Sequence, residues 1–411
     1  MANSDVEVAV IGGGAAGIAA ARRLSDAGVK ALIVEARDRL GGRAWTIHAG
    51  GFAVDLGCGW LHSAERNPWT KIAAAQRRTI DRAPPPWARA TVQPGMTAEQ
   101  SAELRDALWA LHERADALPD DAPDRPLADL LEPGGRWNAA LDAISGYYSG
   151  AALARVSARD LGRYAEDGVN WRIVEGYGAT IAAHGAGLDV ALDSVVTRID
   201  HGGRRIRVET TRGAIAADAA IVTLPSAVLS ADERLFAPAL PDKTRAAAGL
   251  PLGHDDKLFL SLAGAEEFAA DVRAFGKLDT AATAAYQFRP LGRPMIECYF
   301  GGDRAAELER SGADAFFAFA RAELVGLYGG GFARRIAPLA LHGWGADRFA
   351  RGAYSYALPG RADERAVLAA PVEGRLFFAG EACSRGDFST AHGAYLTGVA
   401  AAEQAIEALR P

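Results

Sequence analysis

The feature that most constrains this chain is a glycine-rich turn near its start, placed between two short apolar runs. The first run, residues 6–11, stops at the sequence Gly-Gly-Gly-Ala-Ala-Gly of residues 12–17. A stretch of helical composition follows over residues 15–27, and a second apolar run, residues 31–34, ends at Glu35. Strand, glycine turn, helix and strand, with an acid about 20 residues on, are typical of a dinucleotide-binding βαβ unit.

Each glycine of this turn has a mechanical role in such a unit. Gly12 permits the tight turn, Gly14 lets the backbone approach a pyrophosphate, and Gly17 lets the helix pack closely on the strand. The helix N-terminus offers unpaired N–H groups to the anion, and Glu35 can accept hydrogen bonds from both ribose hydroxyls. The sequence therefore predicts a dinucleotide site formed by Gly12, Gly14, Ala16, Gly17, Glu35, Ala36 and Arg37.

Composition narrows the class of protein. A chain of 411 residues has a prior of two to three domains, and 49% hydrophobic with 23% charged residues is ordinary for a soluble globular protein. A net charge of −6 without a basic patch argues against nucleic-acid binding. Three cysteines without CxxC spacing predict neither a disulfide framework nor a metal site, and they favour a cytoplasmic location. No apolar run is long enough to span a membrane.

Two further segments carry a family resemblance. Residues 39–43, Arg-Leu-Gly-Gly-Arg, resemble the RxGGR segment of flavoproteins with two dinucleotide-binding domains, which implies that Gly42 and Arg43 contact FAD. Residues 54–62, Val-Asp-Leu-Gly-Cys-Gly-Trp-Leu-His, resemble the DLGxxWxH stretch of flavin amine oxidases. In that family the stretch runs beneath the flavin, which implies that Gly59 and Trp60 lie at the cofactor and that His62 lines the substrate cavity.

The middle of the chain predicts a second domain inserted into the first. Thr97 and Gln100 have the spacing of a capping box, and leucines at helical spacing follow them. We expect an α/β fold with a discontinuous FAD-binding Rossmann-type domain and an α+β substrate-binding domain. The FAD-binding domain takes residues 1–79, 174–248 and 348–411, and the substrate-binding domain takes a helical part, 80–173, and a strand-rich part, 249–347. By the family pattern, the strand that holds Val196 supplies backbone hydrogen bonds to the adenine.

Lys257 is the candidate catalytic residue of the strand-rich part. Only five of the 45 cationic residues are lysines, and this one shares a strand face with Phe259 and Ser261, while leucines occupy the other face. A lysine within such a strand needs a polar partner or water. In flavin amine oxidases the matching lysine holds a water against the N5 atom of the flavin.

The segment 344–356, Trp-Gly-Ala-Asp-Arg-Phe-Ala-Arg-Gly-Ala-Tyr-Ser-Tyr, resembles the W…D…RGSYSY run of the polyamine oxidase and histone-lysine demethylase branch. The resemblance implies that Trp344 packs near the flavin and that Tyr354 forms one wall of an aromatic cage, whose face attracts an ammonium group. Mitochondrial monoamine oxidases have a flavin-linking cysteine where this chain has Ala353, so we expect FAD to be bound non-covalently.

The C-terminal segment resembles the FAGE…GAYxSG block of the same family. Residues 376–381 predict a strand that ends at Gly380 and Glu381, both expected at the cofactor, and residues 389–398 lead into a helix expected over 399–409. Ala391 would lie at the flavin. Thr390 stands where monoamine oxidases have the second cage tyrosine, so the cage is half-open or is completed by Trp60 or Phe388.

Taken together, the resemblance implies an FAD-dependent amine oxidase. A neutral primary amine or polyamine would lose a hydride to flavin N5, the imine would hydrolyse, and O2 would reoxidise the flavin to give H2O2. The predicted partners are therefore a small amine and O2, with neither nucleic acid nor membrane, and the predicted assembly is a monomer or homodimer. An FAD-dependent desaturase or protoporphyrinogen-type oxidase, an L-amino-acid oxidase, and a non-catalytic flavoprotein are the alternatives.

Overall fold

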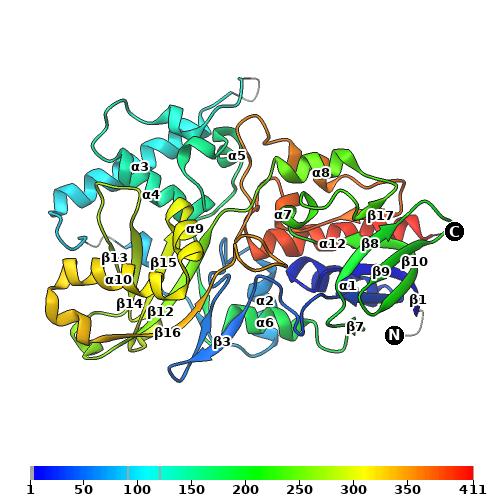
Figure 1. The fold of residues 1–411 in the computed structure, drawn as a ribbon, viewed down its shortest axis with the longest axis horizontal. Helices are drawn as coiled ribbons and strands as arrows, with labels where there is room; N and C mark the ends of the chain where they lie inside the picture. The colour runs from blue at the N-terminus through cyan, green and yellow to red at the C-terminus, as the bar shows by residue number, and fades with distance from the viewer. Residues whose placement is uncertain (1–3, 90–91, 120–121, 411) are drawn as a thin grey trace.

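A computed structural model describes residues 4–89, 92–119 and 122–410. The chain forms two lobes, each built on a β-sheet (Figure 1). The lobe with α1 and α12 contains the larger sheet, and the lobe with α3, α4 and α10 contains a separate five-stranded sheet. This arrangement confirms the predicted mixed α/β fold with a second domain. The exact residue boundaries between the domains stay a prediction.

The larger sheet has parallel strands at its centre and an antiparallel extension on one side. Its order is β11-β8-β9-β10-β1-β2-β7, and β17 also pairs with β10. β1, β2, β7, β10 and β17 are mutually parallel where they pair, whereas β8 and β9 pair antiparallel. The bounds are β1 (Ser4–Ile11), β2 (Ala31–Val34), β7 (Val190–Ala191), β8 (Val196–Asp200), β9 (Ile206–Thr210), β10 (Gly213–Val222), β11 (Phe236–Ala237) and β17 (Leu376–Phe378).

Helices α1 (Ala15–Asp26) and α12 (Ala391–Ala408) pack side by side against this sheet (Figure 1). A Cβ on Gly398 would lie 2.2 Å from the carbonyl oxygen of Ala16, so the contact between the two helices needs glycine there. The last helix starts at Ala391, where Thr390 caps it, so the prediction that it starts at residue 399 is wrong. Gly398 lies within this helix because it is needed for packing and does not end a helix there.

Three short helices pack on the opposite face of this sheet: α7 (Ser226–Leu229), α8 (Pro241–Ala248) and α11 (Glu364–Ala369). Lys243 of α8 is buried, and its ammonium group donates to the carbonyl oxygens of Val367, Leu368 and Ala370 at the end of α11. This lysine therefore caps a helix and joins two elements, a structural task.

The second sheet has the order β13-β14-β15-β12-β16, with every pairing antiparallel. Its strands are β12 (Asp255–Leu262), β13 (Val272–Phe275), β14 (Ala284–Phe288), β15 (Met295–Gly301) and β16 (Ile336–His342). One face packs on α9 (Gly302–Ser311) and α10 (Ala313–Tyr328) through Leu258, Leu260, Cys298 and Phe300. Lys257 pairs with Tyr299 on the opposite face, so the predicted alternation is confirmed.

A helical layer covers part of that opposite face. It consists of α3 (Ala98–Asp116), α4 (Asn138–Ser149) and α5 (Ala158–Gly162), and its core includes Leu104, Leu141 and Phe275. Thr97 accepts from the N–H of Gln100 and the reciprocal bond is present, which confirms the predicted capping box. The remaining strands and α-helices of the described residues are β3 (Thr46–Ala49), β4 (Phe52–Asp55), α2 (Pro68–Ala75), β5 (Ile80–Asp81), β6 (Arg172–Ile173) and α6 (Tyr177–His184).

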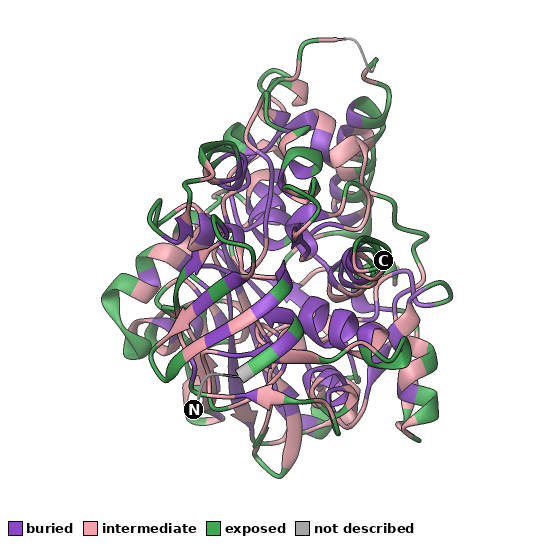
Figure 2. Cartoon of the chain, turned by 90° about the vertical axis from the view of Figure 1, so that its right-hand side faces the viewer, coloured by how far each residue is buried: buried purple, intermediate pink, exposed green. Residues whose placement is uncertain are grey.

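The buried residues run through both sheets and the helices against them, and the exposed residues gather on the outer turns and helices (Figure 2). The interior also holds charged side chains: Arg365 is fully buried, and both carboxylate oxygens of Asp160 accept its hydrogen bonds at 2.7 Å. Within the described ranges, no helix has both the length and the apolarity that crossing a bilayer requires.

Candidate functional site

The glycine turn between β1 and α1 forms an open cradle. Gly12 has a φ of +104°, and a Cβ on Gly17 would lie 1.9 Å from the carbonyl oxygen of Gly12, so both positions need glycine for the fold itself. A Cβ on Gly14 would meet no protein atom nearer than 3.9 Å. The space at Gly14 is thus available to a group outside the protein. No side chain caps α1, whose first N–H groups face this space.

Glu35 and the second glycine pair line the same cradle. One carboxylate oxygen of Glu35 accepts from the N–H of Gly13 at 2.6 Å, and the other accepts from the N–H of Arg37 at 2.8 Å. The N–H of Gly41 donates to the carbonyl oxygen of Gly13 at 2.8 Å, and a Cβ on Gly42 would lie 3.2 Å from Gly14. The two glycine segments therefore touch, as a shared anion site requires.

Arg43 joins the cradle to the C-terminal segment. Its guanidinium donates to the carbonyl oxygen of Ala353 at 2.6 Å and to Glu381 at 2.9 Å. Glu381 is buried and also accepts from the hydroxyl of Ser355 at 2.6 Å. Burial acts to raise the pKa of Glu381, but Arg43 and Ser355 outweigh it, so the pKa is lowered and the carboxylate is ionised.

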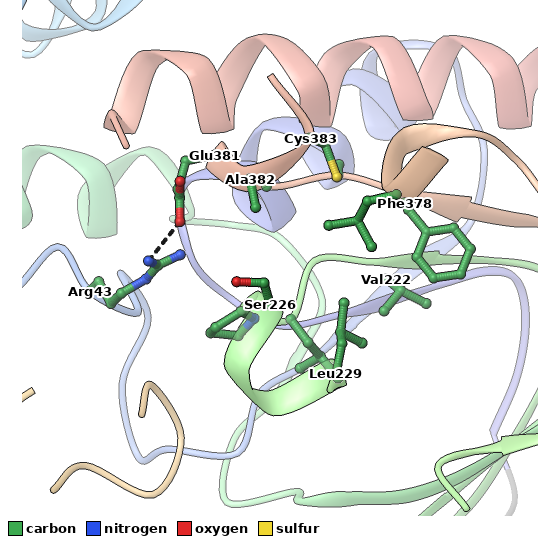
Figure 3. A pocket seen from close by; sticks show the side chains of 13 residues that line it. Arg43, Val222, Ser226, Leu229, Phe378, Glu381, Ala382 and Cys383 are labelled. Carbon is green, nitrogen blue, oxygen red and sulfur yellow. Dashed lines mark hydrogen bonds and ion pairs between the residues drawn. The ribbon is translucent and has the colours of Figure 1, made fainter. Parts of the chain in front are cut away.

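This ion pair lies at one end of a small pocket, whose other end is apolar (Figure 3). The apolar lining comes from Val222, Leu229 and Phe378, the last residues of β10, α7 and β17. The pocket therefore lies where the carboxyl ends of two parallel strands meet, the edge at which open α/β sheets bind ligands.

Lys257 is held against the segment that follows β4. Its ammonium group donates to the carbonyl oxygens of Gly57 at 2.8 Å and Asp55 at 3.2 Å, and it lies 3.3 Å from a carboxylate oxygen of Glu297. A Cβ on Gly59 would lie 3.3 Å from the same nitrogen. The ammonium group is therefore buried, paired and next to the residues expected beneath a flavin.

Trp344 fixes the same segment from another side. Its indole N–H donates to the carbonyl oxygen of Leu56 at 3.0 Å, and its backbone N–H donates to Asp256 at 2.9 Å. A Cβ on Gly57 would lie 1.7 Å from the carbonyl oxygen of Arg43. The backbone of residues 55–59 is thus enclosed between Lys257, Trp344 and the second glycine segment.

An aromatic wall runs from Tyr354 across the second sheet. The hydroxyl of Tyr354 donates to the carbonyl oxygen of Tyr147 at 2.8 Å and lies 3.0 Å from the hydroxyl of Tyr299. The Tyr147 ring meets that of Tyr299 edge-on at 6.0 Å and stacks on Phe275 at 6.0 Å. Burial raises the pKa of Tyr354 and of Tyr299 well above the usual value, so both phenols are neutral.

Trp60 lies between a second aromatic ring and a cation. Its ring meets that of Trp87 at 4.5 Å, and the guanidinium of Arg172 lies 4.9 Å from its centre. Arg172 is itself bound by Asp81 and Asp271. A pocket joins Trp60 and Gly59 to Arg172, Lys257 and Glu297, so these side chains face one space.

His62 belongs to a polar group at the edge of the site. Its Nδ1 lies 2.7 Å from the amide oxygen of Asn170 and 3.4 Å from a carboxylate oxygen of Glu166. Burial acts to raise the pKa of Glu166, but the hydrogen bonds to His62 and Asn170 lower it. The histidine is thus fixed by its neighbours and half-buried.

The other predicted residues occupy structural positions near the site. The hydroxyl of Thr390 donates to the carbonyl oxygen of Asp387 at 2.6 Å and accepts from the N–H of Gly393, which commits it to capping α12. Arg37 makes two hydrogen bonds of 2.9 Å to Asp347. Ala36, Ala391 and Val196 lie respectively beside Arg37, at the first turn of α12 and at the start of β8.

The structure thus brings together the residues taken from the N-terminal, lysine and C-terminal motifs. It adds several that the motifs do not contain: Tyr147, Glu166, Asn170, Arg172, Glu297 and Tyr299. A carboxylate in the otherwise apolar run of β15 is a signal for Glu297, whereas Tyr147 has no such signal in the sequence. Across the described parts of the chain, no cluster of three or more His, Cys, Asp or Glu side chains is arranged for a metal ion.

Comparison with known proteins gives a consistent result. Residues 15–406 match the family model for flavin containing amine oxidoreductase. Polyamine oxidase 2 of Arabidopsis thaliana is 30% identical over 96% of this chain and 87% of its own length. A lysine-specific histone demethylase 1 homolog of Oryza sativa subsp. japonica is 26% identical over 98% of this chain and 57% of its own. A solved structure of putrescine oxidase bound to putrescine superposes with a TM-score of 0.80 at 18% identity over 98% of this chain and 100% of that one, which shows a shared fold.

Proposed function

The chain belongs to the flavin-containing amine oxidoreductases, and from that premise we propose that it oxidises a primary amine or polyamine with non-covalently bound FAD and O2. The observation that carries the proposal is the position of Lys257, whose ammonium group lies against the backbone of residues 55–59 and beside Trp344's anchor at Leu56. The segment of residues 54–62, the strand of Lys257 and the segment that begins at Trp344 meet there, although they are far apart in the sequence.

The residues present fit FAD. The free space at Gly14, the uncapped start of α1 and the guanidinium of Arg43 suit a pyrophosphate, and the carboxylate of Glu35 suits a ribose. Glycine at positions 57 and 59 lets this segment lie close against the backbone of Arg43 and the ammonium group of Lys257. Bound flavin supplies the acceptor for the hydrogen and two electrons that leave the carbon next to the amine nitrogen.

The aromatic side chains would attract the amine and favour its neutral form. An ammonium group is attracted to the face of Tyr354 on approach, and the neutral phenols of Tyr354 and Tyr299 hold no negative charge that would keep the amine protonated. Inside an apolar cavity the charged form is disfavoured, so burial itself promotes loss of the proton from the amine nitrogen. The site therefore needs no dedicated general base.

Lys257 would act as a fixed hydrogen-bond donor. Two of its three N–H groups point at carbonyl oxygens and the third is within reach of Glu297 or a water. A lysine held in this way would place a fixed positive charge next to the part of the flavin at which O2 reacts. Its partner Glu297 holds the ammonium group in place.

Non-covalent binding of FAD is supported by the absence of a reactive side chain at position 353, where mitochondrial monoamine oxidases have a flavin-linking cysteine. Ala353 has no nucleophilic atom. Cys58, the cysteine in the segment under the site, is unpaired, and burial raises its pKa to about 12, which leaves almost no thiolate. Release of H2O2, the cytoplasmic location and a monomer or homodimer stay predictions.

The test is direct. Purified protein should be yellow and should release FAD on acid denaturation. It should consume O2 and form H2O2 with at least one member of a panel of primary amines, diamines and polyamines. Colourless protein that cannot be reconstituted with FAD would contradict the cofactor assignment, and a yellow protein inert to every amine would contradict the substrate assignment.

A further inference from the structure

The aromatic wall ends at a cation. Arg273 lies on β13, two residues before Phe275, and therefore on the same face of the second sheet as Phe275, Tyr299 and Lys257. Its guanidinium lies 4.6 Å from the centre of the Phe275 ring and 5.9 Å from that of Tyr147. The arginine is half-buried and stacks on the rings that continue to Tyr354.

This guanidinium has no polar partner among residues 4–89, 92–119 and 122–410. The other arginines around the site differ: Arg43 binds Glu381, Arg37 binds Asp347, and Arg172 binds Asp81 and Asp271. Five N–H donors in a planar fork, placed on an aromatic shelf with no carboxylate, are suited to a carboxylate that comes from outside.

The side chains around Arg273 are aromatic. Tyr148, which is 47% exposed, lies close enough to the Arg273 guanidinium for that charge to oppose the effect of burial on the pKa of the phenol. Burial also lowers the pKa of Arg273, which the nearby Tyr148, Tyr147 and Tyr299 oppose. An anion that reaches Arg273 would meet a half-buried cation that water only partly shields.

We propose that Arg273 binds a carboxylate at the end of the substrate remote from the amine, so that the substrate is an ω-amino acid or an amine with an acidic tail. The inference rests on the proposed function and narrows it. A free polyamine would instead place a second ammonium group against the guanidinium, and like charges repel.

The spacing of the sheet indicates a distal carboxylate. Lys257 is on β12 and Arg273 is on β13, with β15 and β14 between them. Three strand spacings of about 4.8 Å separate their backbones by about 14 Å. An α-carboxylate lies within two bonds of the amine nitrogen and stays at the Lys257 end of this interval, whereas a chain of methylene groups carries a terminal carboxylate toward Arg273.

The experiment compares four six-carbon probes: hexylamine, hexamethylenediamine, norleucine and ε-aminocaproate. Wild-type protein is compared with Arg273→Met, which keeps the apolar stem over Phe275, with Arg273→Lys, and with Arg136→Gln. Arg136 also stacks on a ring, that of Trp137, but at an exposed site, so its loss controls for removal of one surface cation. Binding of caproate, which lacks an amine, is measured separately by the shift of the thermal unfolding midpoint.

We expect wild-type protein to have its highest kcat/KM with ε-aminocaproate. Arg273→Met should lose at least about tenfold more kcat/KM on that probe than on hexylamine, chiefly through KM, and Arg273→Lys should lose less. A wild-type preference for hexamethylenediamine or norleucine, or an unchanged KM for ε-aminocaproate in Arg273→Met, would overturn the inference. If no amine is oxidised, the proposed function fails, and the caproate measurement still decides: weaker binding to Arg273→Met but not to Arg136→Gln supports the inference, and equal binding to all three overturns it.

Discussion

The ammonium nitrogen of Lys257 lies 2.8 Å from the carbonyl oxygen of Gly57, 200 residues earlier in the chain. This hydrogen bond joins the second sheet to the segment that follows β4, across the boundary between the two lobes. Because Trp344 and Arg43 hold the same segment from other sides, the donor of Lys257 has a defined position relative to the glycine cradle.

Lys257→Met should slow the reaction of the reduced protein with O2 on the order of a hundredfold, because the fixed positive donor is lost. Reduction by amine should change much less. Stopped-flow measurement of the two half-reactions separates these effects, with Lys71→Met, which removes an exposed lysine of α2, as the control. An oxidative half-reaction of wild-type rate in Lys257→Met would remove the role given to this residue.

Gly14→Ala should weaken FAD binding, whereas Gly17→Ala should lower the stability of the fold. Gly14 has a φ of −81° and room for a Cβ, so the apo-protein with alanine there should unfold near the wild-type midpoint but bind FAD at least about tenfold more weakly. Gly17→Ala should lower the free energy of unfolding by about 2–3 kcal/mol, because its Cβ overlaps the carbonyl oxygen of Gly12. Thermal unfolding and FAD titration report the two effects, and wild-type FAD affinity in Gly14→Ala would contradict the assignment of the cradle.

Glu381→Gln should lower the free energy of unfolding by about 2–3 kcal/mol and should weaken flavin retention, because it leaves Arg43 without its buried partner. The control is Glu373→Gln, which removes an exposed ion pair with Arg375 and should cost less than about 1 kcal/mol. Urea unfolding of both variants gives the comparison. Equal losses would show that the Arg43 pair has no more weight than a surface contact.

The carboxyl group of Asp387 should make the free energy of unfolding depend on pH in the acid range. Burial alone would raise the pKa of this carboxyl, but the hydrogen bonds from His392 and Arg66 bring it down to about 2. The unfolded value is about 3.9, so the carboxylate stabilises the fold by about 1–2 kcal/mol above pH ~4, and this contribution is lost as the pH falls through about 2. Asp387→Asn should therefore be less stable than wild type at neutral pH, and the gap should narrow in acid. A gap that does not change with pH would exclude this cause.

Much of the fold could be predicted because its signals are local. The turn at Gly12, the acid at Glu35 and the capping box at Thr97 each depend on residues a few positions apart, and all three form as expected. The alternation around Lys257 is equally local, since neighbouring residues of a strand face opposite sides.

The parts that could not be predicted depend on contacts between distant segments. Gly393 and Gly398 look like helix breakers in the sequence, yet they lie inside α12. They are glycines because Cβ atoms at these positions would overlap Asp387, which precedes the helix, and Ala16, which lies on α1. The hydrogen bond from Tyr354 to Tyr147 joins residues 207 positions apart. Arg273 comes near the wall only through the order of the strands in the sheet, which composition does not reveal.

The central claim is that this chain removes hydrogen from an amine and passes it to a bound flavin. The most direct measurement mixes FAD-loaded protein with excess amine in the absence of O2 and follows the visible flavin absorbance. We predict that the yellow colour bleaches with at least one amine and returns when O2 is admitted. Flavin that stays oxidised with primary amines, polyamines and ω-amino acids alike would contradict the claim.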